Sequence, residues 1–210
     1  RHATGYYNVF LGAEAGLGVS GSTTGNSNIA IGAQAMDSIT SGASNVAIGS
    51  WTGGSNAALS QNTTGVSNIA IGSEALGDNT TGSNNTALGR GALLSNTTAS
   101  NNTVVGYQAR YGGEVTHSAN TVAVGYQSMY MNSATTADAT SSTAIGFQSL
   151  AANSSTTASL TGNTAIGRGA IHIFANTTGQ VRDNVAVGEN ALASNANTTA
   201  SVSFNTAVGK

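Results

Sequence analysis

The sequence predicts an all-β fold, a parallel solenoid in which one short strand recurs in every coil. Three observations lead to this prediction. A five-residue motif returns along the whole chain, its columns alternate between two kinds of side chain, and coil length grows in steps of two residues, from 17 to 19 to 21. A repeat at such a period is typical of solenoids, propellers or arrays.

The motif is Asn-Thr-Ala-Ile-Gly at 163–167, and its glycines fall at 12, 32, 49, 72, 89, 106, 125, 146, 167, 188 and 209. The residue three before each glycine is β-branched, and the residue directly before it is Leu, Ile or Val. Between them lies Ala, except at Phe10 and Val104. Alternate strand residues point to opposite faces. We expect the β-branched and aliphatic columns to fill each coil, and the alanines to let layers or chains approach closely.

A second landmark, usually a Thr-Thr pair, lies between successive glycines, as at 80–81, 97–98, 156–157 and 177–178. Where the coil lengthens, each half grows by two residues, one half at a time. An insertion of two residues preserves the face to which each strand side chain points. We therefore expect a second, return strand in each coil, starting after the glycine, and a roll that widens toward the C-terminus.

The repeat covers residues 1–210 as a single solenoid of about eleven coils. The coils in 1–106 are irregular, those in 107–125 are transitional, and those in 126–210 have a regular length of 21 residues. The longest early coil contains the insertion Gly53-Gly54-Ser55-Asn56. Because the chain starts at Arg1 and ends just after a motif, we expect a processed chain or a fragment.

The composition excludes several classes of function. Only 7% of the residues are charged and the net charge is -2, so there is no basic field for nucleic acid. The absence of Cys excludes disulfides and thiolate metal sites. No apolar run is long enough to span a membrane, and no metal site or cofactor is expected.

The asparagine that opens most motifs is predicted to be structural. Stacked Asn side chains can hydrogen-bond along a ladder of strands, and Asn also suits turns. The expected ladder residues are Asn28, Asn45, Asn68, Asn85, Asn102, Asn163, Asn184 and Asn205. The N-x-S/T sequons, such as those at Asn62, Asn79 and Asn96, are interpreted as turn chemistry, and as glycan sites only in a chain that passes through a eukaryotic secretory route.

The Asn-x-Ala-Ile-Gly-x-x-Ala core resembles the repeat of the β-roll heads of trimeric autotransporter adhesins. The fuller form at 121–129, together with Asn-Thr-Thr-Gly at 79–82, resembles repeat regions of phage tail fibres. The resemblance covers essentially the whole chain. It implies a left-handed parallel β-roll, three identical chains side by side, and a role in attachment.

Two departures from the adhesin pattern refine this expectation. The coils are longer than the usual adhesin head repeat, which favours the fibre-like group, and the sequence contains no coiled-coil stalk, anchor or tip domain. We expect a non-catalytic, extracellular structural or adhesive region of a virion tail fibre or a bacterial cell surface. Its partners would be two further copies of itself and a glycan or protein receptor on a host.

One surface row is a candidate glycan-binding site. Just after the motif glycine, successive coils carry aromatic residues, each followed by a glutamine. In-register stacking would bring the rings about 4.8 Å apart, and amphipathic rings beside amides suit a saccharide. Mutual stacking, or packing between chains, explains the row equally well. The row consists of Tyr107, Tyr126 and Phe147 with Gln108, Gln127 and Gln148.

The residues also suggest two other functions. The segment 166–171 fits the hexapeptide pattern of left-handed β-helix acyltransferases, and His117 or His172 could serve as the base. That fold needs several hexapeptides in each regular coil, whereas only one is visible here, and the histidines and carboxylates form no near-neighbour group. A Thr-rich solenoid could also bind ice or another crystal surface, but the Thr-Thr pairs shift in register between coils.

Overall fold

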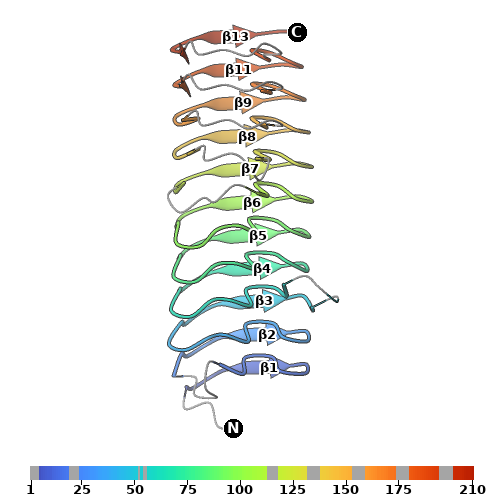
Figure 1. Ribbon diagram of the computed structural model, residues 1–210, viewed down its shortest axis with the longest axis vertical. Helices are drawn as coiled ribbons and strands as arrows, with labels where there is room; N and C mark the ends of the chain where they lie inside the picture. The colour runs from blue at the N-terminus through green and yellow to red at the C-terminus, as the bar shows by residue number, and fades with distance from the viewer. Residues whose placement is uncertain are drawn as a thin grey trace. The chain divides into compact units, whose positions relative to one another are not determined.

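The computed structural model describes residues 5–18, 24–51, 53, 56–112, 118–131, 138–152, 159–173, 180–193 and 201–210. The chain divides into two compact units, Arg1–Asn102 and Thr103–Lys210. Each unit is a parallel β-solenoid built from the repeated motif (Figure 1), and none of the described residues lies in a helix. The predicted all-β solenoid is therefore confirmed.

In the first unit, the motif strands pair in parallel in the order of the sequence. They are β1 (Val9–Leu11), β2 (Ile29–Ile31), β3 (Val46–Ile48), β4 (Ile69–Ile71) and β5 (Thr86–Leu88). Each motif residue lies beside its counterpart in the next coil, so that Ala47 pairs with Ala30 on one side and with Ala70 on the other. Register is thus maintained through the 23-residue step as well as the 17-residue steps.

In the second unit, the motif strands again pair in parallel, in the order β6-β7-β8-β9-β11-β13. They are β6 (Thr103–Val105), β7 (Val122–Val124), β8 (Thr143–Ile145), β9 (Thr164–Ile166), β11 (Val185–Val187) and β13 (Thr206–Val208). A separate, shorter pair joins β10 (Val181–Arg182) to β12 (Val202–Ser203).

The prediction of a return strand in every coil is wrong for the first unit, whose described residues form no second strand. After the motif glycine the chain turns, and alternate residues have a positive φ, as at Glu74 (66°) and Leu76 (50°). A strand cannot contain such residues. The backbone still bonds to both neighbouring coils, because Glu74 N donates to Asn56 O (3.0 Å) and Leu76 N to Ala92 O (3.0 Å). Among the described residues of the second unit, strand pairing outside the motif is limited to β10, β12 and isolated bridges such as Met131 with Ala152.

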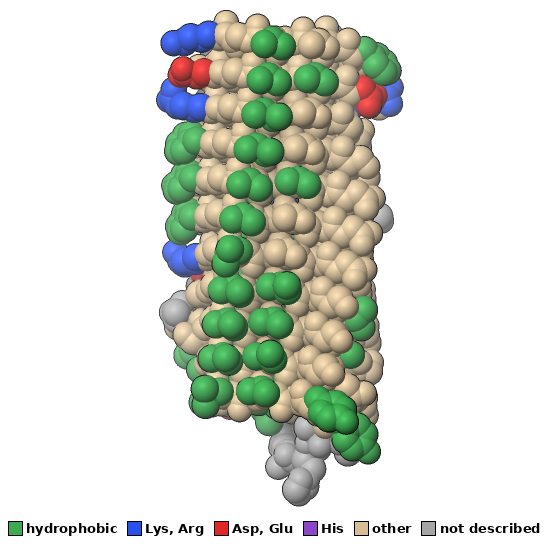
Figure 2. All heavy atoms as spheres, turned by 180° about the vertical axis from the view of Figure 1, so that it is seen from behind, with side chains coloured by type: hydrophobic (Ala, Val, Ile, Leu, Met, Phe, Trp, Pro, Cys, Tyr) green, Lys and Arg blue, Asp and Glu red, His purple; other side chains and the backbone are tan. Residues whose placement is uncertain are grey.

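The prediction of which strand face fills the coil is also wrong. The central alanine of each motif strand points into the coil and is fully buried at Ala30, Ala47 and Ala165. The first and third residues of each strand face outward and are partly or fully exposed. We call these two rows the outward columns. Figure 2 shows hydrophobic side chains of these columns running across the coils.

The interior explains why the central residue must be small. The turn after the motif glycine contributes a long apolar side chain from the opposite wall, such as Leu76 in the first unit and Leu150 in the second. Little room is left between the two walls, so the strand contributes Ala. One of the two exceptions supports this account: at Phe10 the facing position is Gly16, where an added Cβ would lie 2.5 Å from the phenyl ring.

The motif glycine is required by the stacking of the coils. At Gly72 the φ angle is +125°, and a Cβ would lie 2.7 Å from the carbonyl carbon of Gly89. At Gly146 φ is +132°, and a Cβ would lie 2.6 Å from the carbonyl oxygen of Gly167. Backbone therefore contacts backbone at this corner, and only glycine combines the conformation with the close approach.

The substitution Ala165→Leu should destabilise the second unit by about 1–3 kcal/mol, because it overpacks a filled interior. Thr164→Val, whose side chain faces outward, should change the free energy of unfolding by no more than about 0.5 kcal/mol. Urea denaturation followed by far-UV circular dichroism measures both. Equal losses in the two variants would contradict the inward orientation of the alanine column.

Candidate functional site

The motif asparagines of the first unit form a buried ladder of amides. Asn45 Nδ2 donates to Asn28 Oδ1 (3.1 Å) and to the carbonyl oxygen of Gly65 (2.9 Å). Asn45 Oδ1 accepts from the backbone N–H (2.9 Å) and from the Nδ2 (3.1 Å) of Asn68. Both amide hydrogens and the oxygen therefore form hydrogen bonds, so burying this polar group leaves no donor or acceptor unpaired. The ladder runs through Asn28, Asn45, Asn68, Asn85 and Asn102.

A second amide ladder in the first unit consists of Asn62, Asn79 and Asn96. Asn79 Nδ2 donates to Asn62 Oδ1 (2.9 Å), and Asn96 Nδ2 donates to Asn79 Oδ1 (2.7 Å). Each amide also donates to the carbonyl oxygen three residues later, which is that of Gly65, Gly82 or Ala99, and so closes the turn that contains the Thr-Thr pair. These three sequon asparagines are buried. In the folded chain their side chains are occupied by the ladder.

In the second unit, the motif ladder runs from Asn163 through Asn184 to Asn205, with Nδ2 to Oδ1 distances of 3.0 and 3.1 Å. Two earlier coils carry Thr121 and Ser142 in this column. Ser142 Oγ replaces the amide in part, since it donates to Leu160 O (2.8 Å) and accepts from Asn163 N (3.1 Å). All eight predicted ladder residues therefore lie in hydrogen-bonded columns within their own units.

The candidate glycan-binding residues lie together in the second unit. The rings of Tyr107 and Tyr126 are stacked with centroids 5.4 Å apart and planes inclined by 13°. Those of Tyr126 and Phe147 are 5.3 Å apart and inclined by 6°. Beside them, Gln127 Nε2 donates to Gln108 Oε1 (3.1 Å), and Gln148 Nε2 donates to Gln127 Oε1 (2.9 Å). The predicted row is thus a stack of rings next to a ladder of amides.

The ring orientation limits what the row can bind. Saccharides pack on the faces of aromatic rings, but both faces of Tyr126 are covered by Tyr107 and Phe147. The three residues are 39–46% exposed, and the central ring, that of Tyr126, is exposed at its edge. A second parallel stack, Tyr111 on Tyr130, has centroids 5.9 Å apart. This geometry favours contact between the rings themselves over a flat saccharide platform.

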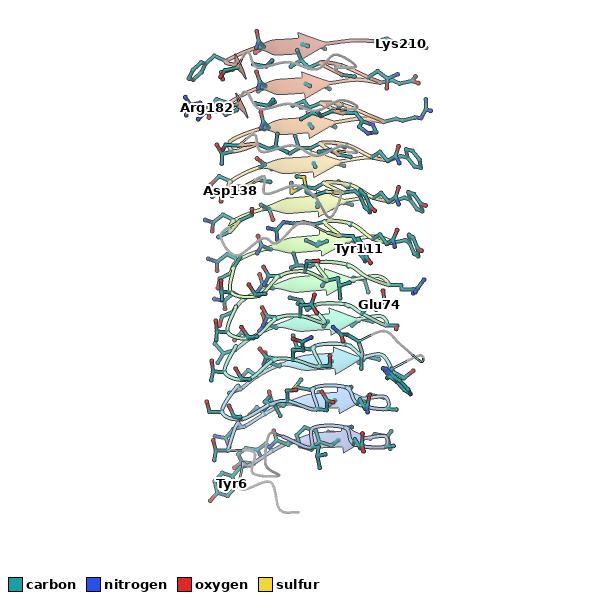
Figure 3. The ribbon with its side chains drawn as sticks, viewed as in Figure 1. Tyr6, Glu74, Tyr111, Asp138, Arg182 and Lys210 are labelled. Atoms are coloured by element: carbon teal, nitrogen blue, oxygen red, sulfur yellow. The ribbon has the colours of Figure 1, made fainter. Side chains whose placement is uncertain are left out.

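The same column continues with charged residues. Arg168 Nη1 donates to Glu189 Oε1 (2.6 Å), and Lys210 Nζ lies 3.7 Å from Glu189 Oε2. In the first unit Arg90 Nη2 lies 3.0 Å from Glu74 Oε1 (Figure 3 labels Glu74). Within the column, rings therefore stack on rings and Glu189 pairs with the cations on either side of it, whereas Glu74 lies one position outside the column. Such pairs stabilise stacked coils.

The triple variant Tyr107→Ser, Tyr126→Ser and Phe147→Ser should lose stability, because each stacked pair contributes about 0.5–1.5 kcal/mol beyond area burial. Thermal unfolding should therefore move to lower temperature. Binding of the still-folded variant to host cells or to a glycan array should be unchanged. A variant that folds with wild-type stability and loses binding would instead assign the row to receptor contact.

One coil of the second unit buries an arginine where its neighbours bury Met129 and Leu150. Arg110 Nη2 donates to Ser118 O (2.8 Å), whereas Nη1 has no hydrogen-bond partner among the described residues. Burial lowers the pKa of the Arg110 guanidinium to about 10, and the negative charge of Asp138 partly opposes this. Asp138 is labelled in Figure 3.

The carboxylate of Asp138 is held in its charged form by its surroundings. Burial alone would raise the pKa of Asp138, but hydrogen bonds from Thr140 and Ser118 and the charge of Arg110 together lower it. Ser118 Oγ donates to Asp138 Oδ1 at 2.9 Å. The negative charge of Asp138 therefore partly compensates the positive charge of the buried Arg110.

We predict opposite effects for the two members of this pair. Arg110→Met should leave the free energy of unfolding unchanged or raise it, because an apolar side chain of similar length replaces a costly buried cation. Asp138→Asn should lower it, because the guanidinium then stays buried without a compensating charge. Chemical denaturation at neutral pH measures both, and a large loss of stability in Arg110→Met would contradict the argument.

The histidines suggested as catalytic bases and the Thr-Thr pairs suggested for surface binding lie only partly in the described chain. His172 is buried, and burial lowers the pKa of its imidazole. His117 and the Thr-Thr pairs at 156–157 and 177–178 lie outside the described residues. In the pairs at 63–64 and 80–81 the first threonine is structural, since Thr63 Oγ1 donates to Thr80 O (3.1 Å) and Thr80 Oγ1 to Thr97 O (2.9 Å).

In the described part of the chain, no three His, Asp or Glu side chains gather as a metal site would require. The same residues include no helix with the length and apolarity needed to cross a membrane. No family model matches the sequence, and neither the curated proteins nor the solved structures contain a match to it.

Proposed function

We propose that this chain is a non-catalytic segment of an extracellular attachment fibre, on a virion tail or a bacterial cell surface. In this proposal the roll is left-handed, has about eleven coils, and assembles side by side with two identical chains. The observation that carries the proposal is the uncovered apolar strand face in each unit.

The outward columns are unusual for a solvent-exposed sheet. In the second unit all their residues are Thr, Val or Ile, and no residue of the outward columns in either unit is charged. Ile29, Ile48 and Ile69 are each 36–41% exposed. Soluble proteins seldom leave a long apolar strip uncovered, and such strips usually mark interaction sites. β-Branched side chains have few rotamers to lose, so burying them costs little conformational entropy.

A second copy of the chain is the partner that best fits this face. The outward columns repeat with the coil, so an identical chain running in the same direction presents side chains at a matching spacing. Within each unit, column can then pack on column in every coil. A globular partner does not present side chains at the spacing of these coils.

The repetition of the coils supports a role in attachment. The exposed polar columns recur with every coil, so that individually weak receptor contacts add through avidity once several chains are joined. The receptor would be a glycan or a protein on the host surface. Amide ladders through each unit supply the stiffness that a fibre shaft requires.

The double variant Ile48→Lys and Ile166→Lys should dissociate the assembly, because it buries unpaired charges in each unit's outward columns. Sedimentation velocity should give a trimer for the wild type and a monomer for the variant at micromolar concentration. Thr81→Lys, placed at an exposed position away from the strands, is the matched control and should remain trimeric. A monomeric wild type would contradict the trimer, and wild-type protein that binds neither host cells nor glycans would contradict the attachment role.

A further inference from the structure

The coil between Gly49 and Gly72 interrupts the repeat of the first unit. It has 23 residues where the coils on either side of it have 17, an excess of six. Trp51 N donates to Ala33 O (3.0 Å), and Asn56 O accepts from Glu74 N (3.0 Å). In regular coils the corresponding bond joins the residues just after the motif glycines, as from Gly91 N to Ser73 O (3.0 Å). Both ends of the insertion therefore lie on the same edge of the solenoid.

Trp51, at the start of this insertion, is the only tryptophan of the chain and is 49% exposed. In the described part of the chain no aromatic ring stacks on it, unlike the tyrosine rows of the second unit. It fills no place in the coil interior. A half-exposed indole without a ladder partner adds apolar surface that the solenoid itself does not use.

Polar groups suited to hydroxyl recognition lie beside the other end of the insertion. Asp78 Oδ1 accepts hydrogen bonds from Asn56 Nδ2 (2.6 Å) and from Gln61 Nε2 (3.1 Å). Gln61 is exposed, and Asn56 and Asp78 are half-buried. The hydrogen bonds hold three planar groups in place, and each group has more donor or acceptor positions than these two bonds use.

The charge of this unit favours an uncharged ligand. Its described residues include four carboxylates and a single cationic side chain, Arg90, which is paired with Glu74. An anionic sugar would meet a negative field there. The four carboxylates belong to Glu14, Asp37, Glu74 and Asp78.

We infer that Trp51, Asn56, Gln61 and Asp78 form a recognition site for a neutral pyranose oligosaccharide. The indole covers the apolar face of one sugar ring, and the amides and the carboxylate bind its hydroxyl groups. The inference rests on the proposed attachment function and names its receptor class. In this account the receptor contacts the interrupted coil that contains Trp51, and not the stacked row that contains Tyr126.

Because Trp51 is the only tryptophan, its fluorescence reports on this site alone. Wild-type protein is first applied to an array of neutral and sialylated oligosaccharides, and the best-retained neutral oligosaccharide is then titrated in solution. The expected result is a saturable shift of the tryptophan emission. Calorimetry with Trp51→Ala should show affinity lower by about tenfold or more, as for loss of a central aromatic contact, while Trp51→Phe keeps part of it.

The controls separate this inference from the proposed function. Tyr126→Ser should bind the oligosaccharide like the wild type, and circular dichroism should show all variants folded. Retention of no neutral oligosaccharide, or equal affinity in Trp51→Ala, would overturn the site. If the wild type and Trp51→Ala bind host cells equally, the attachment role stands and the site is wrong. If the wild type binds no host cell, the proposed function itself fails.

Discussion

The fold of each unit depends on the direct contact of backbone with backbone at the motif glycine. Successive coils approach so closely there that a single added carbon at Gly72 or Gly146 would overlap the next coil. This contact fixes the spacing of the coils, and the spacing then determines everything that repeats with it. Parallel strands pair without a shift, and each side chain lies beside the residue at the same position of the next coil.

Close stacking also explains the polar interior. An amide can be buried without cost only if its donors and acceptor are satisfied, and an identical amide in the next coil provides these partners at each step. Asn45 illustrates this, with two side-chain donor bonds and an acceptor used twice. Polar columns and apolar columns therefore coexist in a coil that is too narrow for an ordinary hydrophobic core. Charge fits less readily, and Arg110 is the exception that needs Asp138.

The sequence predicted the solenoid, the parallel register and the asparagine columns, because each depends on a period that can be counted. It did not predict which face of the strand points inward. Alternating residues show that a strand has two different faces, but not which face is buried. Because large apolar residues are usually buried, the Ile and Val columns were expected inside the coil, which is wrong. In the narrow coil the small side chain of Ala47 is buried, whereas that of Ile48 faces outward. Nor could the return strand be excluded, because residues such as Leu76 and Met36 adopt a positive φ that their side chains do not favour.

The in-register columns have a consequence for how such a chain can change length. Most interior coils of a unit make corresponding backbone bonds to the coil before and after them, so removal or duplication of one such coil joins surfaces that already match. Stability then changes by roughly one repeat and one interface, and no new core has to be designed. Genetic recombination between repeats can therefore lengthen or shorten a unit in single coils. Variation at exposed positions, including an insertion such as that after Trp51, can be copied or lost with the coil that carries it.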